Sequence, residues 1–133
     1  MRCSVMLAGV ILFFSGSVFA ASSDAIQLDV SKGSFTQQQD SILKAINTDV
    51  DYSEISATDR ALVNQSLSSI AGKLNDSPSL ASMGAEIQQQ ILSEQKIIND
   101  SLIQAKKDSR MICKREMVLG SKLDKKVCRT AAS

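Results

Sequence analysis

Apolar residues recur every three or four positions in three stretches of this chain, a spacing that places them along one face of an α-helix. The sequence therefore predicts a helix over residues 35–49, a second that begins after Ser56 and ends at residues 75–78, and a third from about Leu80 to about Arg110. The apolar positions are Phe35, Ile42, Leu43, Ile46 and Val50 in the first, Leu62, Val63, Leu67, Ile70, Ala71 and Leu74 in the second, and Met83, Ile87, Ile91, Ile98, Leu102 and Ala105 in the third.

Polar residues at the expected helix ends support these limits. Ser34 and Gln37 have the spacing of a capping box, in which each side chain bonds a backbone N–H at the start of a helix. Ser56 is the expected N-cap of the second helix, and Asp59 would complement its dipole. Residues 49–54 form the connector between the first two helices.

Large rings are almost absent from the part of the chain that would form the core. Beyond residue 20 the only aromatic side chains are Phe35 and Tyr52, and the chain has no Trp. The interior must therefore be built from aliphatic side chains, as in helix bundles, and this length supports one domain. We expect a mainly α fold with about three helices, namely a short, a medium and a long one.

The first twenty residues have the order of a secretory signal peptide. Arg2 is the only charge before Asp24, the apolar run Val5–Phe14 follows it, and short residues precede Ala20. A run of ten residues is too short to cross about 30 Å of hydrocarbon as a helix. We therefore expect cleavage near Ala20 or Ala21, no transmembrane span in the mature chain, and a periplasmic or secreted protein; a buried N-terminal core helix is the alternative.

Residues 21–33 are mixed in character and are expected to form a flexible N-terminal arm before a helical domain over residues 34–133. A short strand is the alternative, because Ile26, Leu28 and Val30 alternate with polar residues. Cys3 precedes the apolar run and is therefore no lipid-attachment site. The mature chain keeps Cys113 and Cys128, an even number in an exported protein, which predicts one disulfide. Free thiols or half of a zinc site are the alternatives, but a chain with no His and two Cys lacks zinc ligands.

The two cysteines are symmetric about the Gly120-Ser121 pair. Equal arms around Gly-Ser favour a β-hairpin with a two-residue turn, in which Gly takes a positive φ. Glu116 would then lie opposite Lys125, and Val118 opposite Leu123. The alternatives are a bulge in the hairpin and a helix that continues to Leu119, with Gly120 as its C-terminal cap. Either way, residues 113–128 form a disulfide-closed loop or short hairpin.

Three segments carry a resemblance. They are Cys113-Lys114-Arg115-Glu116 with Gly120-Ser121-Lys122-Leu123 and Lys126-Val127-Cys128-Arg129-Thr130, then Tyr52-Ser53-Glu54-Ile55 with Asp59-Arg60, and finally Asp108-Ser109-Arg110. With them the chain resembles uncharacterised small secreted or periplasmic proteins of Gram-negative, xanthomonad-type bacteria, which have a Cys-x6-Gly-Ser-x6-Cys tail. The resemblance covers most of residues 35–130. It implies export and the disulfide, and it brings no activity with it.

The sequence offers little for catalysis, metal binding or a cofactor. Without His, the usual base for a Ser or Cys nucleophile is missing, although Ser–Lys neighbours remain. Asp49, Asp51 and Ser53 fit the start of a calcium loop, but Glu54 replaces the required Gly and Arg60 the final Glu. We predict no catalytic residue, no metal ligand and no cofactor, and therefore a protein that is not an enzyme.

Charge is sorted along the mature chain. Residues 21–103 carry eleven acidic and five basic side chains, whereas residues 104–133 carry nine basic and three acidic ones. The candidate residues for binding an anionic partner are Lys114, Arg115, Lys122, Lys125, Lys126 and Arg129. No aromatic platforms accompany them, so nucleic acid is not expected. The alternatives are a merely solvated surface and a tail neutralised by the acidic helices.

These features predict a non-enzymatic interaction or structural protein. It would bind an envelope protein or an anionic envelope surface through its basic C-terminal region. An accessory or inhibitor domain of an exported enzyme, with the disulfide loop as a rigid insertion element, is the alternative.

Overall fold

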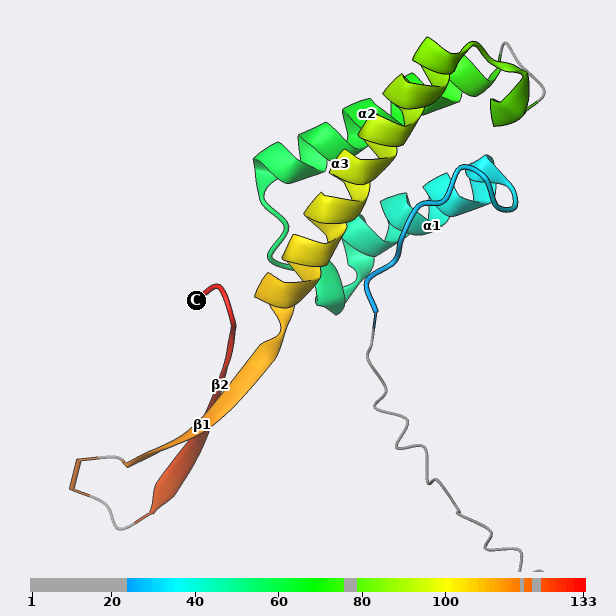
Figure 1. Ribbon diagram of the computed structural model, residues 1–133. Helices are drawn as coiled ribbons and strands as arrows, with labels where there is room; N and C mark the ends of the chain where they lie inside the picture. The colour runs from blue at the N-terminus through cyan, green and yellow to red at the C-terminus, as the bar shows by residue number, and fades with distance from the viewer. Residues whose placement is uncertain (1–23, 76–78, 118, 121–122) are drawn as a thin grey trace, which may run out of the picture.

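The computed structural model describes residues 24–75, 79–117, 119–120 and 123–133. The expected signal peptide, Lys122 and the predicted partner Val118 lie outside these residues. The described chain forms three α-helices, two short 3₁₀ turns and a C-terminal hairpin (Figure 1). They are α1 (Phe35–Thr48), η1 (Val50–Tyr52), α2 (Ala57–Asn75), η2 (Leu80–Ser82), α3 (Ala85–Ser109), β1 (Met111–Met117) and β2 (Asp124–Thr130). The predicted fold class is confirmed.

α2 and α3 run side by side in opposite directions (Figure 1). α1 contacts α2 and the turn η1, and η1 in turn contacts α3. Their inward faces form one aliphatic core, in which most of the predicted positions are buried. Val50, Leu62 and Ile87 are exposed instead. α1 ends at Thr48, and the 3₁₀ turn that follows places Tyr52, rather than Val50, in the core.

The two predicted N-caps differ in outcome. The Ser56 hydroxyl accepts from the Asp59 N–H at 3.0 Å and donates to the Asp59 carboxylate at 2.6 Å, so its cap is confirmed. Ser34 stands at the start of α1, but its side chain makes no capping bond, so the predicted capping box is wrong. The neighbouring Gln38 instead turns its amide toward residues 29–32.

The third helix is shorter than the sequence predicts. Residues 80–82 form a 3₁₀ turn, Met83 is extended and buried, and α3 begins only at Ala85 after Gly84. Gly is a poor helix former because its backbone loses more freedom than that of any other residue, which allows the break. The 25 residues of α3 still span about 37 Å.

Residues 24–32 fall within the N-terminal arm that the sequence predicts over residues 21–33. They cross the helical body as an extended strap, in which Leu28 is buried. Asn99 of α3 pairs with the backbone of Leu28: its Oδ1 accepts from the N–H at 2.7 Å, and its Nδ2 donates to the C=O at 3.0 Å. Gln95 accepts from the Val30 N–H and the Tyr52 hydroxyl from the Ile26 N–H.

One residue, Arg110, separates α3 from the hairpin, which projects away from the helices (Figure 1). Each seven-residue strand spans about 23 Å. At its base the chain returns to α3: the Ala132 N–H donates to the Asp108 C=O at 3.2 Å, and the Ala131 N–H to the Arg110 C=O at 2.9 Å. The bond to Asp108 satisfies a carbonyl that the end of α3 would otherwise leave unpaired. Within the described residues, no helix has the length and apolar character to cross a membrane.

Candidate functional site

The hairpin register places the candidate basic residues on two faces. Cys113 lies opposite Cys128, Glu116 opposite Lys125 as predicted, and Gly120 has a φ of 90°. Cross-strand partners share a face, and successive residues alternate between faces. Arg115 and Lys126 therefore share the face of the disulfide, whereas Lys114, Lys125 and Arg129 lie on the other. The hairpin is confirmed and the continued helix is excluded, because β1 begins at Met111.

The predicted disulfide joins the strands with a Cα–Cα distance of 4.0 Å and an S–S bond of 2.06 Å. Both cysteines are exposed, and all seven residues of β1 are exposed as well. An isolated two-stranded hairpin is marginally stable in water. The disulfide therefore holds a hairpin that gains little from packing, and such bonds are typical of compartments outside the cytoplasm.

The five described candidate cations are Lys114, Arg115, Lys125, Lys126 and Arg129, and all are exposed. None of them forms an ion pair with another described residue. Arg115 directly faces Lys126, a like-charge arrangement that costs about 0.5 kcal/mol. The hairpin thus keeps its positive charge available. Of the basic residues after position 103, Lys106 of α3 is the one that an acidic side chain neutralises in the described structure, since it pairs with Asp51 at 3.4 Å.

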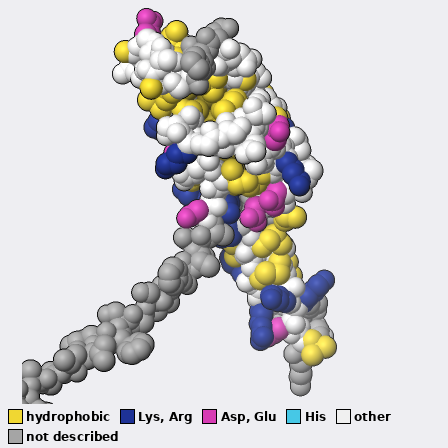
Figure 2. Space-filling view, turned by 90° about the vertical axis from the view of Figure 1, so that its right-hand side faces the viewer, with side chains coloured by type: hydrophobic (Ala, Val, Ile, Leu, Met, Phe, Trp, Pro, Cys, Tyr) yellow, Lys and Arg dark blue, Asp and Glu magenta, His cyan; other side chains and the backbone are white. Residues whose placement is uncertain are grey.

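Apolar side chains accompany these charges, a feature that the sequence reasoning missed. Met117 is 85% exposed, Leu119 is fully exposed and Leu123 is 78% exposed, all beside the turn. Figure 2 shows basic side chains around the far half of the hairpin and apolar ones near its end. The signal was present in the run from Met117 to Leu119, which stands at the turn of a predicted hairpin where polar residues are usual.

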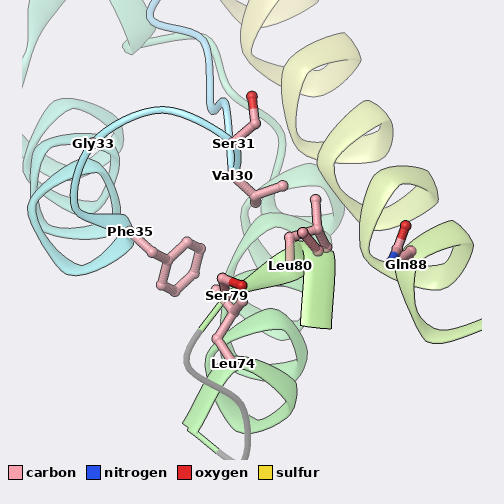
Figure 3. Close-up of a pocket in the computed structure, with 9 residues that line it drawn as sticks. Val30, Ser31, Gly33, Phe35, Leu74, Ser79, Leu80 and Gln88 are labelled. Atoms are coloured by element: carbon pink, nitrogen blue, oxygen red, sulfur yellow. The ribbon is translucent and has the colours of Figure 1, made fainter. Parts of the chain in front are cut away.

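A hollow with a volume of about 560 Å³ lies where the strap meets α1 and the end of α2 (Figure 3). Its lining is apolar and neutral polar: Val30, Ser31, Gly33, Phe35, Leu74, Ser79, Leu80, Ala81 and Gln88. The Gln88 amide already donates to the Met83 C=O. None of the described residues that line this hollow carries a charge, so they form no acid–base pair.

Among the described residues, Ser69 and Lys73 of α2 are hydrogen-bonded neighbours that face Glu94 of α3. Lys73 Nζ donates to Ser69 Oγ at 2.9 Å and to Glu94 Oε1 at 2.8 Å, and Ser69 Oγ donates to the same oxygen at 2.7 Å. The Glu94 carboxylate accepts from both side chains and so links α2 to α3. These three side chains therefore act as a polar clamp between the helices.

The acidic connector has structural roles. The Asp49 carboxylate accepts from the Asp51 N–H at 3.0 Å, and the Glu54 N–H donates to Ser109 Oγ at 2.9 Å. In the part of the chain that the structure describes, no three acidic or cysteine side chains are grouped to hold a metal ion.

In the strap, hydrogen bonds from the Ser31 hydroxyl and then from Lys32 hold the pKa of Asp29 below its ordinary value.

The basic hairpin is thus the candidate functional site, and its geometry suits binding. No protein-family model, no curated protein and no solved structure matches the chain.

Proposed function

We propose that this protein is exported and works without catalysis, by presenting its disulfide-braced hairpin to an anionic protein or surface of the cell envelope. The observation that carries the proposal is the set of exposed basic side chains on the hairpin, none of which is paired with a described acidic residue. Like charges facing each other destabilise a free hairpin, and an anionic partner would relieve that repulsion.

Export is the first part of the proposal. It is supported by the order of Arg2, the run Val5–Phe14 and Ala20, and by a disulfide, a bond that is typical of oxidising compartments. Mass spectrometry of the envelope fraction should find a chain that begins at Ala21 or Ser22. Recovery of the uncleaved chain from the cytoplasm would contradict this part.

The second part is tested by charge reversal on the hairpin. In Arg115→Glu/Lys126→Glu, retention on an immobilised anionic surface should fall by more than tenfold, since each basic group near such a surface contributes about 1 kcal/mol. Binding of the unchanged protein should also weaken with salt, because exposed charges are screened beyond about 8 Å at physiological ionic strength.

The matched control is Lys44→Glu/Lys107→Glu, which changes the net charge equally but lies on α1 and α3. Both lysines are exposed and form no ion pair with a described residue. The control should keep most of the binding. Equal losses in the two variants would show that net charge alone governs retention and would refute a hairpin site.

A second candidate is an accessory or inhibitor domain of an exported enzyme. The observation that favours it is the projecting hairpin, in which Met117 and Leu119 are exposed beside the turn. Such a rigid element fits the entrance of a concave active site. Saturable one-to-one binding to an enzyme from the same envelope fraction, abolished by Leu119→Ser, would favour this candidate over surface binding.

A further inference from the structure

We propose that the partner is an anionic phospholipid bilayer, and that the tip of the hairpin inserts into its interface. The tip comprises Met117, Leu119 and Leu123. This inference rests on the proposed function, because it assumes that the basic hairpin binds an anionic surface. It goes further by naming phospholipid as the surface and burial of apolar side chains as the mode of binding.

The apolar character of the tip is the first step. Met117 and Leu119 are almost wholly exposed to solvent, and Leu123 follows them across the turn with 78% of its surface exposed. Large apolar groups gathered at one projecting point, rather than scattered over the surface, mark an interaction site. The hairpin gives them no core to enter, because its strands stand clear of the helices (Figure 1).

The position of the charges relative to the tip is the second step. The pair Arg115–Lys126 lies two register positions behind the pair Met117–Asp124, which corresponds to about 7 Å along the strands. Interfacial segments bury their apolar side about 5–10 Å into the boundary between headgroups and acyl chains. Insertion of the tip to that depth would therefore bring both cations to the level of the lipid phosphates, where their flexible stems can follow the headgroups.

Charge decides in favour of an anionic bilayer over a neutral one. Residues 111–130 contain six basic and two acidic side chains, a net charge of +4. Each basic side chain near an anionic leaflet strengthens binding by about fivefold. Glu116 and Asp124 oppose this attraction, and because they are outnumbered three to one the net effect remains attractive.

The backbone limits the depth of insertion. Both strands of a two-stranded sheet have an outer edge with unpaired N–H and C=O groups, which are costly in hydrocarbon. Only the turn and its apolar side chains can therefore enter, and the strands must stay among hydrated headgroups. The structure thus predicts interfacial anchoring rather than a span.

The test uses the mature, disulfide-bonded chain beginning at Ala21, which retains every residue that the structure describes. It is mixed with vesicles of phosphatidylcholine alone, or of phosphatidylcholine and phosphatidylglycerol in equal parts. Binding should be at least tenfold tighter to the anionic vesicles. Met117→Ser/Leu119→Ser should lower that binding by at least about tenfold, because it removes two apolar side chains from the tip.

The matched control is Val50→Ser/Leu92→Ser, which removes two exposed apolar side chains from the helical body. It should bind the anionic vesicles as the unchanged protein does. The tip variant should also keep its salt-sensitive retention on an anionic resin, which has no apolar interior. That result separates loss of insertion from loss of the basic site.

A fluorescent reporter tests insertion directly, since the chain has no Trp of its own. Leu119→Trp should show a blue-shifted emission with anionic vesicles and quenching by lipids brominated on the acyl chain, whereas Val50→Trp should show neither. An unshifted Leu119→Trp, together with unchanged vesicle binding by the tip variant, would overturn insertion while leaving the basic site intact. No vesicle binding at all, with salt-sensitive capture of an acidic protein by the hairpin, would overturn the lipid partner. If charge reversal leaves every form of binding unchanged, the inference and the proposed function both fail.

Discussion

At the scale of single residues, side-chain amides hold the N-terminal strap on the helices. The Asn99 amide bonds both the backbone N–H and the backbone C=O of Leu28. The Gln38 amide does the same for the backbone N–H and C=O of Asp29. Buried backbone groups need such partners because water does not reach them. An extended segment is therefore ordered here without joining a sheet.

Replacement of Asn99 tests this anchoring. Asn99→Ala should lower the free energy of unfolding by about 2 kcal/mol, because it leaves the N–H and C=O of a buried residue without partners. Thermal unfolding followed by circular dichroism gives the measurement. The adjacent Asp100→Ala, which removes an exposed ion pair with Lys96, should cost no more than about 0.5 kcal/mol. Equal effects of the two changes would contradict a structural role for the strap.

The sequence indicates the Ser56 cap but not the Asn99 contact, and the reason is the range of each interaction. Ser56 bonds a residue three positions away, within reach of a local pattern. Asn99 bonds a backbone 71 positions away, and at a polar helical position it is indistinguishable from a surface residue. Ser34 has the spacing of a capping box but makes no side-chain capping bond. Spacing along the chain does not determine where a side chain points.

At the scale of elements, periodicity predicts the helices and the paired cysteines predict the hairpin. The apolar spacing identifies all three α-helices, but the break at Gly84 depends on Met83 turning into the core. The symmetry of Cys113 and Cys128 about Gly120-Ser121 gives the observed register, since a disulfide and a short turn leave few alternatives. How the basic side chains divide between two faces follows only once that register is known.

Removal of the disulfide should loosen the hairpin and leave the helices in place. In Cys113→Ser/Cys128→Ser, the loss of loop closure corresponds to about 3 kcal/mol in the chain-entropy model. Because the hairpin packs little on the core, this loss should be confined to residues 111–130. Amide hydrogen exchange should therefore become fast there, while the melting temperature of the helices falls by only a few degrees. A cooperative loss of helical protection would show that the hairpin supports the core.

At the scale of the whole molecule, charge and shape are segregated together. Residues 21–133 carry fourteen basic and fourteen acidic side chains, so their net charge predicts no attraction to anions. The surplus of positive charge, however, lies on the element that projects farthest from the helices (Figure 2). Oriented charge of this kind steers association even in a neutral protein, provided that the charged end meets the partner first.

A chain that ends at Arg110 tests whether the two parts are separable. The hairpin meets α3 through the backbone bonds of Ala131 and Ala132, so their loss should lower the melting temperature only slightly and preserve the helical circular dichroism. Residues 21–110 contain twelve acidic and eight basic side chains, a net charge of −4. The shortened protein should therefore pass through a cation exchanger that retains the chain of residues 21–133 at neutral pH. Retention of the shortened chain would show that the anion-binding site lies on the helices. Unfolding of the shortened chain would show that the hairpin is needed for the stability of the helical core.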